Sequence, residues 1–529
     1  GARFFVYILG LPQHLILFSF SVPTYIPLMA LFISIALWLA LSGGLVTMMV
    51  TDCLEGMIAQ VMYLVIIVGL LAMFDWSQIS TVLAQRPAGQ SFLNPFDSGS
   101  LKDFNLTYVL MGLFGTIYGT MAWQNASAYN SAALTPHESR MAGILGRWRE
   151  LGKVAVVTLL AVCAITFLQH PDFAAQSAQA RLGISQISPP QIQSQMTVPV
   201  ALSHLLPIGV KGSLCIILLL GVFGGDSTHL HSWSGIFIQD ILVPLRKKPF
   251  EPKQHILALR LSAIGVALFA FLFGCFFRQT EYIFFWWTIT QTIYIGGAGA
   301  AIIGGLYWGK GTTAGAWAAL LTGSTLSVGG ILARQFYGDA IPLNVVQISF
   351  FATLTAIAVY VIVSLLTCRE AFNMERMLHR GKYAAIKELV GETVKPATGR
   401  RGWLGRAIGF DENFTLGDKW IAGCLFSWSM LWFFVFAVGS IWNLVAPWPL
   451  HVWSTFWHVT CIGLPIGFAT VSAVWFTWGG LRDMGELFRR LRVQTINHLD
   501  DGTVIGHQNL DEAVLDISQN PEVGHNHAK

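Results

Sequence analysis

Long apolar runs constrain this chain more than any other feature of its sequence. A helix needs about 20 consecutive apolar residues to cross about 30 Å of hydrocarbon. Runs of this kind do not alternate as barrel strands do, and a lipid-exposed backbone must satisfy its own hydrogen bonds, so each run is predicted to be a helix. We count about eleven such runs, at residues 24–49, 53–74, 106–131, 152–169, 211–242, 256–278, 282–307, 312–334, 345–367, 418–445 and 453–478.

The composition supports the same class of protein. Charged residues make up 11% of the 529 residues, against about 25% in a soluble domain. The aromatic content of 13% excludes a disordered chain. The fold class is therefore predicted to be all-α, a polytopic membrane helix bundle surrounded by lipid. It would have about 11 full transmembrane helices plus an N-terminal partial one.

The cysteines and the net charge give no indication of disulfides, a zinc site or a nucleic-acid partner. The 7 cysteines lie in or beside apolar runs and form no C-x-x-C pair, so we interpret them as buried apolar residues rather than disulfides or a zinc site. The net charge of +4 is small and gives no indication of a nucleic-acid partner, so none is predicted.

Basic residues predict the orientation of the bundle. They concentrate in the connections 132–151, 243–255 and 368–417 and in the C-terminal tail, and an even number of predicted helices separates each from the next. The positive-inside rule therefore places all four in the cytoplasm. We expect a multi-pass protein of the inner membrane.

Four stretches are not predicted to span. Residues 372–380 and 481–491 have amphipathic spacing beside basic residues, which favours helices lying in the cytoplasmic interface. Residues 170–207 are predicted to be an ordered or partly ordered outside loop. Residues 500–529 are polar without periodicity, and we expect a mobile tail.

The most unusual run places polar residues within a predicted span. Asp226 and Ser227 follow a Gly224-Gly225 pair, and His229 and His231 come next. A buried carboxylate is costly in the membrane, so a functional ion or proton site centred on Asp226 is favoured over a polar helix–helix interface. The two histidines diverge on a helix, so for them a structural role is favoured.

Two other spans carry groups suited to a polar solute. Aromatic, hydroxyl and amide side chains can stack on a solute and hydrogen-bond to it. The alternative is an aromatic belt with helix–helix bonds, which better explains residues 123–130 and is an even alternative for Tyr118 and Thr120. In the second span, Gly296-Gly297-Ala298-Gly299 permits tight packing or a bend. The candidate solute-binding residues are Tyr118, Thr120, Gln124, Thr288 and Gln291.

Asp52 is a further acid at a predicted helix start. A position in the first turn, where an acid interacts favourably with the helix dipole, is the first interpretation, and a role in ion release is the second. The sequence contains no phosphate-binding Gly loop, no Ser/His/Asp arrangement and no H-E-x-x-H. We therefore predict that the protein is not an enzyme and uses no cofactor.

Three short motifs carry a family resemblance. They are Gly305-Leu306-Tyr307-Trp308 with the following Lys310 and Thr312, Gly43-Gly44-Leu45 with Thr51-Asp52, and Ser234 to Ile241. In this order they resemble the sodium:solute symporter family. The resemblance implies the leucine-transporter fold of two inverted five-helix repeats, with solute and ion near the membrane midplane.

The resemblance also implies a division of the chain. Residues 1–74 would be the remainder of the first repeat and 106–307 the complete second repeat. Core helices one and two would be missing, so further helices are expected upstream. The remaining parts would be additional spans at 312–367, a cytoplasmic loop with its amphipathic helix at 368–417, C-terminal spans at 418–478, and a cytoplasmic helix and tail at 479–529.

One departure from the family leaves the coupling ion open. The family has two adjacent hydroxyl residues where this chain has Gly224 and Gly225. Backbone carbonyls can still bind Na⁺, with Asp226 and Ser227 compensating, and H⁺ coupling is the alternative. The candidate ion-binding residues are Gly221, Gly224, Gly225, Asp226, Ser227 and Asp52.

These patterns predict a secondary active transporter. It would couple Na⁺ or H⁺ to symport of a small polar solute, a sugar, amino acid or organic acid, by alternating access. The alternative is a transporter-like membrane sensor that binds a solute without net transport. The oligomeric state stays open.

Overall fold

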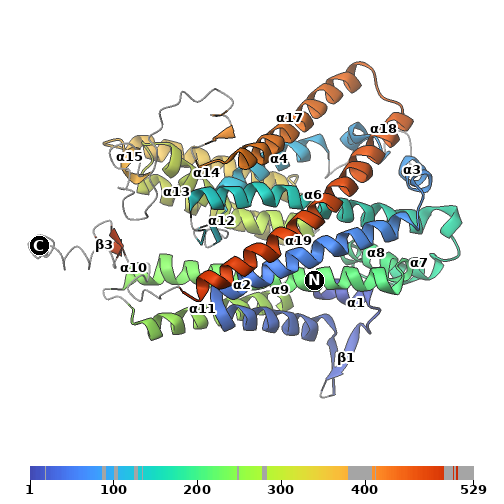
Figure 1. The fold of residues 1–529 in the computed structure, drawn as a ribbon, viewed down its shortest axis with the longest axis horizontal. Helices are drawn as coiled ribbons and strands as arrows, with labels where there is room; N and C mark the ends of the chain where they lie inside the picture. Colours follow the sequence, from blue (N-terminus) through green and yellow to red (C-terminus); the bar gives the residue numbers. More distant parts are fainter. Residues whose placement is uncertain are drawn as a thin grey trace, which may run out of the picture.

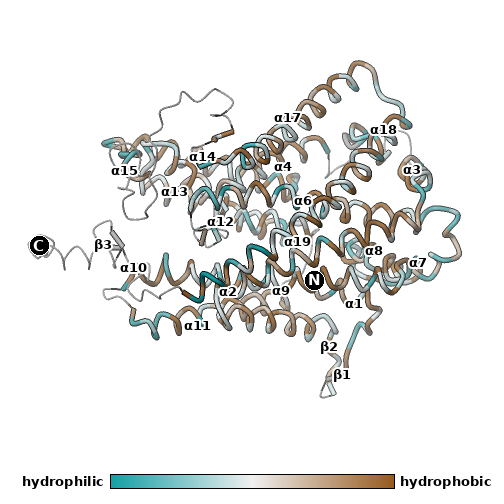
Figure 2. The backbone as a smooth tube through the Cα atoms, viewed as in Figure 1, coloured by the Kyte–Doolittle hydropathy of each residue, from teal (hydrophilic) through white to brown (hydrophobic). Residues whose placement is uncertain are grey.

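The computed structural model describes residues 1–529 with gaps. It leaves out residues 18, 86–90, 101–104, 124–128, 131, 134, 247–249, 277–282, 379–404, 406–407, 411–412, 494–503, 506–507 and 510–529. Within the described residues, nine helices are long and apolar enough to cross a membrane. The predicted polytopic bundle of membrane helices is confirmed (Figures 1 and 2).

The first half of the chain builds most of the helices that position the cavities. In order they are α1 (Ala2–Ile8), β1 (His14–Leu17), β2 (Phe20–Pro23), α2 (Tyr25–Leu71), α3 (Trp76–Ala84), α4 (Leu106–Ala122), α6 (Pro136–Gln169), α7 (Ala178–Ser185), α8 (Pro190–Leu205), α9 (Ile208–Ile236) and α10 (Val243–Leu245). Strands β1 and β2 form an antiparallel hairpin. A π-helical turn, Phe237–Leu242, joins α9 to α10, and short 3₁₀ turns lie at Pro95–Ser100 and Pro171–Phe173.

The second half is also mostly helical. It contains α11 (Pro252–Phe276), α12 (Ile283–Tyr307), α13 (Thr313–Tyr337), α14 (Val345–Thr367), α15 (Met374–Met377), α17 (Leu416–Val445), α18 (Leu450–Trp457) and α19 (Leu464–Leu491). A 3₁₀ turn follows α13 at Gly338–Ala340, and a π-helical turn at His458–Gly463 joins α18 to α19. Strands β3 (Val504–Ile505) and β4 (Gln508–Asn509) pair within the tail that the sequence predicted to be mobile.

Side-chain caps explain where several of the helices begin. Thr135 accepts a hydrogen bond from the backbone of Glu138 ahead of α6, with Pro136 at the first helical position. Asn344 with Gln347, and Thr415 with Asp418, form reciprocal capping boxes at α14 and α17. Each cap satisfies backbone donors that the first helical turn leaves unpaired.

Helix α2 is a hairpin of two antiparallel arms. Gly44 has φ 56° and ψ −144°, a conformation that favours glycine and breaks the helix. On the first arm, Phe32 packs on Phe223 and the later Ala36 packs on the later Leu230, so this arm runs parallel to α9. The second arm runs against α9, because residue 52 bonds to residue 228 and Gly69 lies against Val210. The two predicted spans are therefore present, but they meet at Gly44 rather than after residue 49.

Glycines allow the closest helix approach in the second half of the chain. A Cβ on Gly297 of α12 would collide with the backbone of Ala319 and Leu320 in α13, and a Cβ on Gly323 would collide with the backbone of Gly297. The Gly296–Gly299 stretch therefore provides tight packing, and α12 continues through it as a regular helix.

Three predicted boundaries change in the structure. The expected interfacial helix at 481–491 is the continuation of α19, since Gly479 and Gly480 do not interrupt it and Gly480 lies against Met57 of α2. The span predicted at 106–131 begins with α4, which ends at Ala122, and residues 124–128 lie outside the described residues. In place of the helix predicted at 372–380, the described residues contain the short α15, Met374–Met377, and residues 379–380 lie outside them.

The loop predicted at 170–207 is ordered without spanning. It forms α7 and α8, neither of which is a candidate span. Ala201 and Leu202 of α8 are buried in the main hydrophobic core, together with Ile66 of α2 and Leu159 of α6. This core holds the second arm of α2, α6, α8 and α19 together beside α9.

Short elements lie toward the two ends of the bundle. Helices α10 and α15 and strand β3 lie toward one end of the long axis, and α3, α7 and α18 lie toward the other (Figure 1). The polar ends and apolar middles of the helices follow the same axis (Figure 2). The described residues next to α10 and α15 therefore lie toward the same end, and most of the basic residues of these connections lie outside the described residues.

Candidate functional site

A cavity of about 740 Å³ lies between α4, α12 and α14. Four of the five residues predicted to bind solute line it, namely Tyr118 and Thr120 of α4 and Thr288 and Gln291 of α12. The fifth, Gln124, lies outside the described residues. We call this the solute cavity.

The lining of the solute cavity is polar and aromatic without a permanent charge. Among the described residues that line it, none is Asp, Glu, Lys or Arg. Hydroxyl and amide groups line the wall beside aromatic rings, including Phe114, Trp123, Trp287 and Phe350. Such a lining can stack on a ring and hydrogen-bond to hydroxyl groups.

Tyr118 positions one wall of this cavity. Its side chain is 7% exposed, and its hydroxyl donates to the backbone oxygen of Gly296 at 2.9 Å. The ring fills the space that a side chain at residue 299 would take. The hydroxyl is therefore engaged in holding α4 against α12, and Thr120, Thr288 and Gln291 are better placed for solute contacts.

A second cavity of about 330 Å³ contains the acids of the second α2 arm. Its charged lining residues are Asp52 and Glu55 of α2 and Arg149, Glu150 and Lys153 of α6, three acids and two bases, and Thr228 of α9 also lines it. Asp52 Oδ2 accepts hydrogen bonds from the hydroxyl of Tyr129 at 2.8 Å and from Thr228 Oγ1 at 3.3 Å. We call this the acidic cavity.

The structure overturns the first interpretation of Asp52. The second arm begins directly after Gly44, so Asp52 lies about two turns inside the helix rather than in its first turn. Its Oδ1 atom is buried and has no hydrogen-bond partner among the described residues. The carboxylate therefore faces the cavity instead of capping a helix.

Glu55 was not among the predicted site residues. It lies one turn after Asp52, so both carboxylates project from the same face of the arm. A Cβ on Gly224 would collide with the carboxylates of both Asp52 and Glu55. The i, i+3 spacing of the two acids in a predicted span was the signal that could have identified Glu55.

The predicted ion-binding residues on α9 divide between two faces. Gly221 and Gly224 face the acids of α2, and Gly225 lines the acidic cavity. Asp226 is exposed and points about 200° around the helix from Gly224. Asp226 and Asp52 therefore do not converge on one ion.

The predicted backbone ligands are engaged in the helix. Helix α9 is continuous from Ile208 to Ile236, so it holds its carbonyls in the regular hydrogen-bond pattern. Ser227 is fully buried, and its hydroxyl donates to the oxygen of Gly224 at 3.0 Å. The side-chain oxygens available as ligands therefore belong to the α2 acids and to Thr228, and the buried one without a hydrogen-bond partner among the described residues is Asp52 Oδ1.

His229 lines both cavities. Its Nδ1 donates to the backbone oxygen of Gly225 at 2.7 Å, which fixes the orientation of the ring. Sequence reasoning favoured a structural role for His229, and its bond to Gly225 one turn earlier is consistent with that role. Its place in both linings is a feature that the sequence analysis did not predict.

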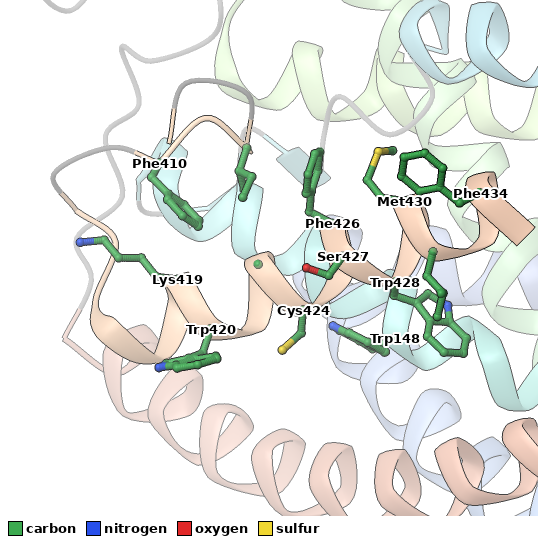
Figure 3. Close-up of a pocket in the computed structure, with 13 residues that line it drawn as sticks. Trp148, Phe410, Lys419, Trp420, Cys424, Phe426, Ser427, Trp428, Met430 and Phe434 are labelled. Carbon is green, nitrogen blue, oxygen red and sulfur yellow. The ribbon is translucent and has the colours of Figure 1, made fainter. Parts of the chain in front are cut away.

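A third hollow, about 960 Å³, lies along α17. Figure 3 shows Trp148 of α6 beside Trp428 of α17, with Phe426 just before Trp428 and with Met430 and Phe434 further along the helix. The lining is largely aromatic and aliphatic, and it brings together no convergent set of polar groups. It is therefore not a candidate for a polar solute.

Comparisons with known proteins give matches among solved structures only. No family model matches the chain, and no curated protein matches it. A solved structure of a Na⁺-coupled sialic acid symporter, in a substrate-bound outward-open state, is similar with a TM-score of 0.47 and 17% identity. The match covers 69% of this chain and 71% of that one. The two cavities therefore carry the functional proposal.

Proposed function

We propose that this chain is a secondary active transporter that couples a cation, Na⁺ or H⁺, to symport of a small polar solute by alternating access. The observation that supports it is the pair of cavities. The described lining of the first has no Asp, Glu, Lys or Arg, the second carries three acids and two basic residues, and both border His229 of α9.

The solute would bind in the solute cavity. Thr120, Thr288 and Gln291 would hydrogen-bond to it, Gln124 stays a predicted contact, and Tyr118 would shape the wall. Because the lining carries hydroxyls, amides and rings without fixed charge, it favours a neutral, hydroxyl-bearing ring among the sugars, amino acids and organic acids first considered.

The cation would bind in the acidic cavity. Ionisable residues within transmembrane segments are costly and mark ion pathways. Asp52, Glu55 and Thr228 supply oxygen atoms, and the unpaired Oδ1 of Asp52 gives the cation or proton a place to bind. Asp226 is the alternative site that the sequence predicted, and it lies on another face of α9.

Transport tests this proposal directly. The purified protein in liposomes would be offered tritium-labelled glucose, galactose, myo-inositol, proline and N-acetylneuraminic acid under an imposed Na⁺ gradient or an imposed pH gradient. We expect one gradient to drive accumulation of at least one solute, and collapsing that gradient to abolish it. Binding without accumulation would instead indicate the sensor, and chemical conversion of a solute would indicate an enzyme.

A further inference from the structure

We infer that His229 couples the two cavities, so that occupancy of the acidic cavity changes the solute cavity through this side chain. The inference rests on the proposed function. His229 is exposed on α9 and borders both cavities. His231, two residues later on α9, is half-buried and is not part of either lining.

Neighbouring residues of α9 reach the two sites. The Thr228 hydroxyl donates to the Asp52 carboxylate at 3.3 Å. It also lies at hydrogen-bond distance, 2.9 Å, from the Tyr129 hydroxyl. His229 is the next residue, and it lines both cavities. Because the two residues are consecutive in one helix, a displacement of the backbone at Thr228 also displaces the backbone at His229.

The hydrogen bonds of the ring separate two roles. Nδ1 donates to the oxygen of Gly225, a bond within α9 that fixes the ring. Because that bond uses Nδ1, Nε2 is the ring nitrogen that it leaves for contact with another group. On this inference Nδ1 is assigned to the helix and Nε2 to the coupling.

Linkage gives the expected size of the effect. A cation in the acidic cavity would favour one arrangement of Thr228 and His229 and so change the affinity of the solute cavity for its solute. By linkage, the bound solute changes the affinity for the cation by the same factor. Coupling between sites is typically about 5- to 150-fold in affinity.

Two conservative variants distinguish coupling from a structural role. The amide of asparagine can replace Nδ1 and keep the bond to Gly225, but it does not reach as far as Nε2. The amide of glutamine reaches the position of Nε2. If His229 couples the cavities, His229→Gln retains the coupling and His229→Asn loses it. If only the bond to Gly225 matters, the opposite result is expected.

The coupling can be measured without knowing the solute. Gln291→Cys in a cysteine-free background, in liposomes, places one thiol in the solute cavity. Its rate of reaction with a small maleimide is compared in Na⁺ and in choline, and at acidic and alkaline pH. Because the thiolate is the reacting form, each rate is divided by the rate of free N-acetylcysteine at the same pH. We expect Na⁺ or acidic pH to change this ratio about 5-fold or more, with the change retained in His229→Gln and His231→Gln and lost in His229→Asn.

The other outcomes overturn the inference. An unchanged rate in the protein with native His229, or a response that survives in His229→Asn, would show that the cavities are not coupled through this residue. Retention of the purified variants as single peaks on size exclusion controls for misfolding. Failure of the proposed function has a different signature. If the labelling rate responds to the cation but no labelled solute accumulates in liposomes, the cavities are coupled in a protein that does not transport these solutes.

Discussion

At the scale of residues, Asp52 and Asp226 are the two candidate cation-binding acids. Asp52 points into the acidic cavity with an unpaired oxygen, whereas Asp226 is exposed on another face of α9. Glu55 strengthens the first alternative because it lines the same cavity. Hydropathy and motif comparison ranked Asp226 first, since neither indicates which way a side chain points around a helix.

Neutralising each acid separates these alternatives. Asp52→Asn removes the charge that would hold the cation, and hydrogen bonds to charged groups contribute about 1.5–3 kcal/mol, so gradient-driven uptake should fall at least about tenfold. Asp226→Asn should retain most of the uptake. Initial rates in liposomes measure both, with equal amounts of inserted protein as the control. The reverse order of losses would move the cation site to Asp226.

At the scale of elements, α12 and α13 pack through glycine backbones. Gly297 and Gly323 are placed so that neither helix has room for a methyl group at the contact. This contact supports the wall that carries Thr288 and Gln291. Local disturbance of it should therefore reach the solute cavity.

Single methyl groups test this packing. Gly297→Ala forces the α13 backbone away, and overpacking of this kind costs about 1–3 kcal/mol, so the melting temperature in detergent should fall. Gly329→Ala is the matched control on α13, because a Cβ there meets nothing within 4 Å. Thermal unfolding followed by size exclusion measures both. Equal melting temperatures for the two variants would contradict the close contact.

At the scale of the whole molecule, the bundle is expected to have one cytoplasmic end. The connections rich in Lys and Arg accompany α10 and α15, which lie at the opposite end from α7 (Figure 1). The positive-inside rule then assigns the α15 end to the cytoplasm. Solute and cation would leave toward that end during symport.

Labelling from one side of the membrane tests this orientation. Glu370 and Gln186 are exposed residues near α15 and α7, respectively. In a cysteine-free protein in intact cells, a membrane-impermeant maleimide should label Gln186→Cys at once and Glu370→Cys only after permeabilisation. The opposite pattern would invert the predicted orientation.

Much of the fold follows from local properties of the chain. Apolar runs identified the helices, because a backbone in lipid has to satisfy its own hydrogen bonds and helices do so within one segment. The basic connections were assigned to one side because the Lys and Arg content of each connection can be read from the sequence alone. Tyr118, Thr120, Thr288 and Gln291 were also identified as solute candidates from their types and their depth in the predicted spans.

Tertiary structure decided which polar groups meet. Gly44 reverses α2, and only this reversal brings Asp52 and Glu55 against Gly224 and Thr228. Amino-acid type determines whether a segment enters the membrane, because transfer free energy is a property of the segment. Which face of that segment meets a cavity depends on neighbours distant in the chain, and packing among α2, α6 and α9 settles it.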